Sequence, residues 1–254
     1  MKEQSPALQA EEKRQELLDE GGTAMLDAER NRRSAGASGA ADGVKVVGVY
    51  LALVGMLLVQ GGLYRTSLST GLLASLNLVV PLLGMALILL MLRCFHENAG
   101  SMGITSENWG TSVLLGAVLA VLLLAGMAVY SVFGAHKSLQ ISGTTGFGVL
   151  IFIAGAVHEE LAFRGYIEHH LETVIRNIPV CSILTAGLFL LIHYPIFWAL
   201  EGRVTFVELS AVRAADILVL HFLCDFTARK TRCLWGAMVL HFLYNMGVSV
   251  FIFV

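Results

Sequence analysis

The sequence predicts an all-α, polytopic transmembrane bundle of about seven helices, and three observations lead to this fold class. Apolar residues make up 56% of the chain and charged residues only 14%, and the mean hydropathy is +0.72. These values lie outside the range of soluble globular proteins. The apolar residues form seven segments, each near the length of about 20 residues that a helix needs to cross a bilayer. Glycines are scattered through these segments, and small residues let membrane helices approach closely.

The chain begins with a polar leader. Residues 1–43 contain no bulky apolar run and end in a stretch rich in Gly, Ala and Ser. Such a composition cannot bury enough apolar surface to fold by itself. We therefore expect a disordered cytosolic tail over 1–43 and a transmembrane domain over 44–254.

The predicted spans follow one another with short polar breaks. The sixth is the least regular, because Glu208, Arg213, Asp216 and His221 lie inside it. We expect that span to be tilted or partly interfacial, with its polar stripe facing the bundle. The seven segments are placed at 44–64, 72–92, 111–134, 146–171, 181–200, 206–227 and 234–254.

The Lys and Arg residues of the polar breaks are divided unevenly between the two sides of the predicted membrane. One side has only Arg65, Lys137 and Arg203. The other side has Arg30, Arg32, Arg33, Lys45, Arg93, Arg176, Arg229, Lys230 and Arg232. The positive-inside rule therefore predicts a cytosolic N-terminus and, after seven crossings, a C-terminus on the opposite side.

Two adjacent carboxylates and a guanidinium stand inside the fourth apolar segment. A charged side chain at the bilayer centre costs about 2.5 to 3.5 kcal/mol on insertion scales, so such groups need partners or water. Glu160 and Arg164 are i and i+4 on the predicted helix and can form an ion pair. Glu159 lies about 100° around the helix from Glu160, so its side chain projects in a different direction and is free to contact another group. The alternative is that all three form a structural ion network, which would leave Glu159 without a role.

Two later segments add histidines within apolar helices. Phe189 and His193 are one turn apart, and His241 and Asn245 share a face at i and i+4. Unpaired polar groups scattered in lipid would each be costly, so we expect these groups and Glu159 to converge on one wet cavity near the cytosolic half of the bundle. A carboxylate beside a histidine can deprotonate a water, and a histidine with an amide can donate to an oxyanion. Taken singly, each histidine could instead be a satisfied packing residue, which is how we interpret His158 and His221.

The same residue types could bind a metal. The His158-Glu159 pair begins like the zinc motif His-Glu-x-x-His, but position 162 is Ala, so the second histidine ligand is missing. Glu159, His193 and His241 could still provide three zinc ligands. We expect no cofactor and keep zinc as the alternative.

Three motifs in this order resemble a known family. They are Glu159-Glu160-x-x-x-Arg164, Phe189-x-x-x-His193 and His241-x-x-x-Asn245, with Leu-Trp ahead of the last histidine. The pattern is similar to that of the CPBP family of CAAX-processing and bacteriocin-processing membrane proteases, also called the Abi family, which includes the type 2 CAAX prenyl protease. The resemblance covers residues 146–248, with a weaker similarity at 102–109.

The resemblance implies an intramembrane glutamate protease that requires no metal. By this analogy Glu159 activates water with the help of His193, while His241 and Asn245 stabilise the oxyanion. Glu160 and Arg164 hold the helix in position. No position of the three motifs is substituted. The family also contains immunity proteins, membrane regulators and scaffolds, and retention of the motifs does not separate these from proteases.

We therefore predict an integral membrane endopeptidase acting on a peptide or membrane-protein substrate. Short loops and small size favour a bacterial cell membrane. The expected partners are the substrate and the lipid bilayer, with no nucleic acid. Two alternatives stay open: a non-catalytic scaffold, regulator or immunity protein of the same fold, and a transporter whose permeation path is lined by Arg213 and Asp216.

Overall fold

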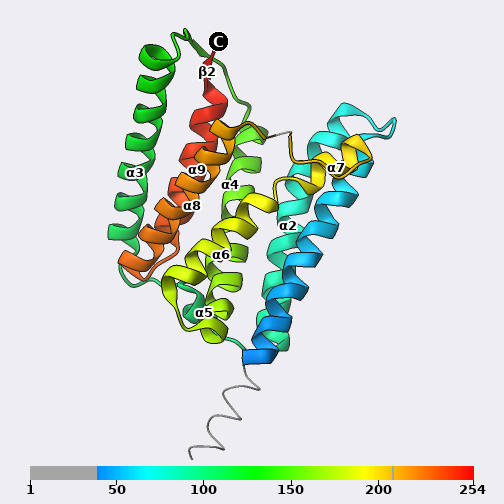
Figure 1. Cartoon of the computed structure of the whole chain (residues 1–254), viewed down its shortest axis with the longest axis vertical. Helices are drawn as coiled ribbons and strands as arrows, with labels where there is room; N and C mark the ends of the chain where they lie inside the picture. Colours follow the sequence, from blue (N-terminus) through cyan, green and yellow to red (C-terminus); the bar gives the residue numbers. More distant parts are fainter. Residues whose placement is uncertain (1–38, 208) are drawn as a thin grey trace, which may run out of the picture.

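The computed structural model describes residues 39–207 and 209–254 (Figure 1). The predicted tail, with Arg30, Arg32 and Arg33, lies outside the described residues except for 39–43. That short stretch is helical rather than disordered, because the first helix runs from Gly39 to Tyr64. Alanines at 40 and 41 favour a helix, and Thr173 Oγ1 donates to Asp42 Oδ2 at 2.6 Å, which ties this first turn to the bundle.

The described chain is a bundle of helices that alternate in direction (Figure 1). Five helical stretches are long and apolar enough to cross a membrane: Gly39–Tyr64, Thr70–Cys94, Trp109–Gly134, Gly146–Ile175 and Ile178–Glu201. Helices α8 (Ala211–Thr231) and α9 (Trp235–Val250) complete the bundle. The prediction of a polytopic, nearly all-α membrane bundle is confirmed.

Several of these five helical stretches consist of more than one element, which the sequence does not predict. Several contain a π turn or a break. In order, the elements are α2 (Thr70–Cys94), the 3₁₀ turn η1 (Ala99–Met102), α3 (Trp109–Val129), the π turn η2 (Tyr130–Gly134), α4 (Gly146–Glu160), the π-helix η3 (Leu161–Glu168), α5 (His169–Ile175), α6 (Ile178–Leu191) and α7 (Pro195–Glu201).

Two strands depart from the all-α prediction. Strand β1 (Leu139–Ile141) pairs antiparallel with β2 (Phe251–Phe253), and Leu139 lies opposite Phe253. The predicted seventh helix therefore ends at Val250 instead of 254. Aromatic and β-branched residues dominate the end of the chain, and such residues favour strands. The sixth span is also shifted: α8 begins at Ala211, where the Ser210 side chain caps it, and not at 206.

Helix α9 is the most central of the C-terminal elements. It packs against α3, α4 and α8, while α2 packs against α4 on the other side of the bundle (Figure 1). The α3–α9 crossing is so close that a Cβ atom on Gly116 would collide with the carbonyl group of Gly236. Ser112 Oγ accepts from Gly236 N at 2.9 Å and donates to Cys233 O at 2.9 Å. Small residues and a hydroxyl thus join these helices, as is usual in membranes.

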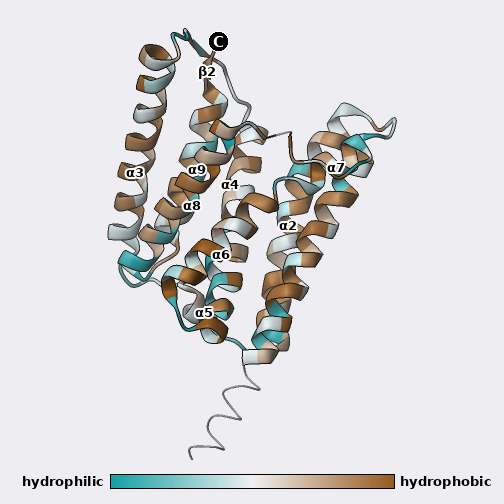
Figure 2. Ribbon diagram, viewed as in Figure 1, coloured by the Kyte–Doolittle hydropathy of each residue, from teal (hydrophilic) through white to brown (hydrophobic). Residues whose placement is uncertain are grey.

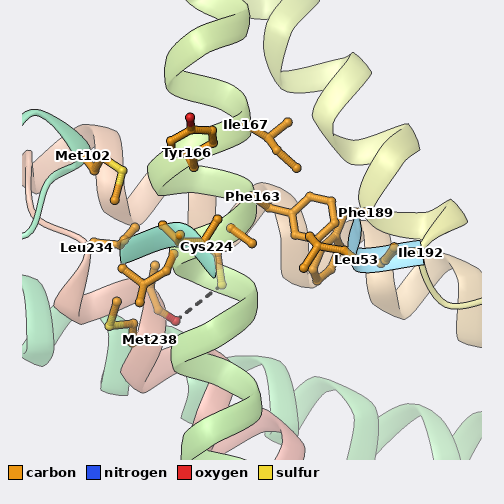
Figure 3. Close-up of a cluster of buried hydrophobic side chains, with 14 of the residues drawn as sticks. Leu53, Met102, Phe163, Tyr166, Ile167, Phe189, Ile192, Cys224, Leu234 and Met238 are labelled. Carbon is orange, nitrogen blue, oxygen red and sulfur yellow. Dashed lines mark hydrogen bonds between the residues drawn. The ribbon is translucent and has the colours of Figure 1, made fainter. Parts of the chain in front are cut away.

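The hydrophobic core surrounds η3. All eight residues of η3 are buried, so this segment has neighbours on every side. Figure 3 shows Phe163 directed toward Phe189 and Ile192, with Met102 and Leu234 on the opposite side of the helix. The Phe163 and Phe189 rings meet edge to face at 5.0 Å between centroids. The core therefore encloses the segment that directly follows the two adjacent glutamates.

The polar residues are gathered at the two ends of the bundle. Figure 2 shows hydrophobic residues along the flanks of the long helices and hydrophilic residues mainly in the turns at the ends. The end at which the Gly39–Tyr64 helix begins has Lys45, Arg93, Arg176, Arg229, Lys230 and Arg232. The opposite end has Arg65, Lys137 and Arg203. The described helices thus reproduce the uneven division of charge.

Candidate functional site

The last turn of α4 and the π-helix after it place the three charged residues of the first motif. Single π turns within helices are frequent at functional sites. Glu160 is completely buried, and its Oε1 atom accepts a hydrogen bond from Arg164 Nη1 at 3.0 Å. The predicted i, i+4 ion pair is present in the structure. Arg164 also lies over the ring of Phe189, with 4.4 Å between Cζ and the ring centroid, which is a cation–π contact.

Glu160 also holds His241 of α9. The Nδ1 atom of His241 lies 2.7 Å from Glu160 Oε1. An ionised carboxylate can only accept, so Nδ1 carries the proton of this hydrogen bond. The other ring nitrogen, Nε2, is directed toward Glu159, with 3.7 Å between Nε2 and Glu159 Oε2. One glutamate therefore orients the imidazole ring and the other faces its free nitrogen.

His193 is held by the backbone and not by a side chain. Helix α6 ends at Leu191, and α7 begins at Pro195, which has no backbone N–H with which to continue the earlier helix. In the turn between them, His193 Nδ1 donates to the carbonyl oxygen of Phe189 at 2.7 Å. A carbonyl can only accept, so neutral His193 presents an unprotonated Nε2 atom.

The side chains predicted to converge do meet in one cavity. A cavity of about 430 Å³ is lined by Glu159, His193, His241 and Asn245, together with residues of α8. A neighbouring cavity of about 390 Å³ shares Glu159, His193 and Asn245 and continues between α2 and the Gly39–Tyr64 helix. Along α9 the first cavity reaches Ser249, near the end where β1 and β2 pair. It therefore extends toward the end of the bundle opposite the one that is rich in Lys and Arg.

The partner of His221 is a contact that the sequence did not predict. Arg164 Nη2 donates to His221 Nδ1 at 2.9 Å and to the His221 backbone oxygen at 3.2 Å. Since a guanidinium only donates, His221 Nδ1 is unprotonated. His221, which lies on α8, thus holds the Nη2 atom of the Arg164 guanidinium, while Glu160 holds Nη1. A buried histidine on an apolar helix was the available signal, but nothing in the spacing connected it with a residue 57 positions earlier.

The three residues that the sequence offers as zinc ligands, Glu159, His193 and His241, do not form a compact cluster of ligand atoms in the structure. Among the described residues, the cluster whose ligand atoms all lie within 4.8 Å of one another consists of Glu160, Cys224 and His241, and not of Glu159, His193 and His241. The Oε1 atom of Glu160 already accepts from Arg164 and His241. A guanidinium at 3.0 Å would repel a metal cation bound to the same carboxylate.

The fold and the site together define an integral membrane protein with a carboxylate and two histidines in an internal cavity. Residues 141–247 match the family model described as Rce1-like, type II CAAX prenyl endopeptidase Rce1-like. This part of the chain is similar to that family of CAAX proteases, and the resemblance seen in the three motifs is confirmed. No curated protein and no solved structure matches the chain. The family indicates a protease-type function, and all residues of the three motifs lie within the matched segment.

Proposed function

We propose that the protein is an intramembrane endopeptidase in which Glu159 activates the water that attacks the peptide bond. The observation that carries the proposal is the shared cavity: Glu159 lines it together with His193 and His241. Among the residues that the structure describes, no arginine pairs with the Glu159 carboxylate, whereas Arg164 pairs with that of Glu160. It is therefore available as a general base, which must reach the proton that it removes.

The reaction would divide the polar groups into two sets. Glu159 takes a proton from water while the water oxygen attacks the carbonyl carbon of the scissile peptide. His193 Nε2 accepts a hydrogen bond from the same water, because its Nδ1 atom is occupied by Phe189 O. The proton then passes from Glu159 to the leaving amine as the C–N bond breaks.

The second set stabilises the negative charge on the former carbonyl oxygen. Asn245 offers its amide N–H, and His241 offers Nε2–H. Because His241 Nδ1 already donates to Glu160, donation from Nε2 requires the imidazolium form. Glu160 is placed to stabilise that cation, which gives the buried glutamate a role in addition to its pairing with Arg164.

The location of the protein forms part of the proposal. The greater number of Lys and Arg residues at the end where the Gly39–Tyr64 helix begins supports a cytosolic position for that end. A bacterial cell membrane is the proposed location. The substrate is a peptide or a membrane-associated protein.

The test is cleavage of a pool of synthetic peptides by the purified protein in detergent, followed by mass spectrometry. We expect Glu159→Gln and Glu159→Ala to abolish cleavage, because loss of a general base costs about 10²- to 10⁴-fold. Glu201→Gln is a matched control, since Glu201 is half exposed and pairs with the exposed Arg203. Undiminished cleavage by Glu159→Gln would refute the proposal, and a non-catalytic scaffold would retain its cellular activity in the same variant.

A further inference from the structure

One cation in the catalytic cavity has no counterpart in the three motifs. Arg213 lines both the 430 Å³ cavity and its neighbour, beside Glu159 and Asn245. It lies in the first turn of α8, where its backbone N–H donates to the Ser210 cap at 3.2 Å. A positive side chain is unfavourable near a helix N-terminus, where the helix dipole is also positive. The stability of α8 therefore does not explain an arginine at this position.

The contacts of Arg213 differ from those of the other arginines inside the bundle. Arg164 pairs with Glu160, and Arg229 pairs with Glu168, Glu172 and Asp225. The Nη1 atom of Arg213 donates instead to a neutral group, the hydroxyl of Tyr244, at 3.2 Å. Across residues 39–207 and 209–254, no carboxylate oxygen lies within 4.0 Å of its guanidinium nitrogens.

An arginine of this kind is suited to bind an anion. The guanidinium has five N–H donors in a fixed plane, and it binds carboxylates through two parallel hydrogen bonds. With one donor on Tyr244, the remaining donors are available on the side of the cavity. A half-buried cation is costly when no negative group compensates it. A substrate that brings a carboxylate would supply that compensation.

We propose that Arg213 binds a carboxylate of the substrate close to the scissile bond, an inference that rests on the proposed peptidase function. Tyr244 follows His241 by three residues on α9, which is about 4.5 Å along the helix axis. An extended peptide rises about 3.3 Å per residue. The carboxylate therefore belongs about one to three residues from the cleaved bond. It is either the C-terminal carboxylate of the peptide or the side chain of Asp or Glu.

The experiment compares matched peptide pools with the purified full-length protein in detergent. In the first pair, one pool has a free C-terminal carboxylate and the other an amidated C-terminus. In the second pair both pools are amidated, and one has Asp where the other has Asn at fixed internal positions. We expect the wild type to prefer one carboxylate-bearing pool by about tenfold or more in kcat/KM. The pair in which the preference occurs identifies the source of the carboxylate.

The variants assign the preference to Arg213. Arg213→Gln should abolish the preference, chiefly by raising KM, and Arg213→Lys should retain part of it. Arg203→Gln is the control for loss of a cation at the same end, because Arg203 is exposed and pairs with Glu201. Asp216→Asn tests the rival explanation, an ion pair between Arg213 and Asp216 one turn further along α8. That explanation predicts that Asp216→Asn reproduces the effect of Arg213→Gln.

Each outcome bears on one of the two proposals. Equal cleavage of acid and amide, and of Asp and Asn peptides, by the wild type would overturn the carboxylate site while leaving the peptidase intact. An unchanged preference in Arg213→Gln, or the same loss in Asp216→Asn, would overturn it as well. If the wild type cleaves no pool, the peptidase proposal fails and the carboxylate site fails with it. Thermal unfolding in detergent verifies that each variant is folded.

Discussion

The Nδ1 atom of His241 lies 2.7 Å from the Oε1 atom of Glu160, which also accepts from Arg164. A single buried oxygen therefore joins α9 to the segment formed by α4 and η3. Glu159, one residue earlier, is directed into the cavity instead. The two adjacent glutamates thus have different surroundings: one is enclosed by cationic and polar side chains, and the other faces the space where a substrate would lie.

Replacing Glu160 should therefore affect both stability and cleavage. In Glu160→Gln the shape is kept but the charge that compensates the buried Arg164 is lost. Removal of one partner from a buried ion pair costs about 3 to 5 kcal/mol. We expect a large fall in thermal stability in detergent, together with a loss of cleavage because the negative charge that would stabilise the His241 imidazolium is gone.

A double variant separates these two effects. Glu160→Gln combined with Arg164→Met removes both charges, so no unpaired ion remains buried. We expect the double variant to regain most of the stability but none of the activity. If Glu160→Gln alone were as stable as the wild type, the ion pair would make no contribution to the fold.

Pro195 should matter for the position of His193. The proline separates α6 from α7, and His193 lies in the turn between them. Pro195→Ala permits a continuous helix and displaces the imidazole. Because small misplacements of a catalytic group can cost about 10²-fold, we expect kcat/KM to fall strongly while the unfolding temperature changes little. Pro179→Ala is the control, since this proline begins α6 and does not touch the cavity. Equal activity of the two proline variants would contradict the prediction.

The α3–α9 crossing should be sensitive to a single methyl group. A Cβ atom at Gly116 would collide with the backbone of Gly236, so Gly116→Ala must push the helices apart. We expect a loss of about 1 to 3 kcal/mol, as for other overpacked sites. Gly126→Ala on the same helix meets nothing within 4 Å and should be neutral or slightly stabilising. Thermal unfolding of both variants in the same detergent makes the comparison, and similar melting temperatures would show that the crossing can relax.

Chelation tests whether a metal takes part. The Glu160, Cys224 and His241 cluster includes the carboxylate that pairs with Arg164, which disfavours a bound cation. We expect cleavage to survive a strong chelator and Cys224→Ala to retain activity within about twofold. Cys224 is completely buried, so the metal content and melting temperature of this variant are measured alongside. Activity that is lost on chelation and restored by Zn²⁺ would establish a metal centre.

Local sequence rules predicted most of the bundle and the members of the candidate site. The hydropathy and length of the apolar segments predicted the long helices, and the i, i+4 spacing predicted the ion pair between Glu160 and Arg164. The His221–Arg164 contact could not be predicted, because it depends on how α8 packs against η3. The pairing of β1 with β2 was missed because the two strands have only three residues each and lie far apart in the sequence, so that no local pattern connects them. The shift of α8 was missed because an apolar stretch before Ser210 extended the hydropathy pattern beyond the true cap.

The buried π-helix has a consequence for how this protein can vary. In a π turn each N–H bonds to the carbonyl five residues back, so one additional residue is accommodated relative to an α-helix. Deleting one residue of Leu161–Glu168 would convert a π turn into an ordinary α-helical turn and change the directions in which the side chains of this segment project. Since all eight residues of the segment are buried, the surrounding core would have to repack to accept that change. Related chains should therefore tolerate substitutions on their lipid-facing sides while keeping the number of residues in this segment constant.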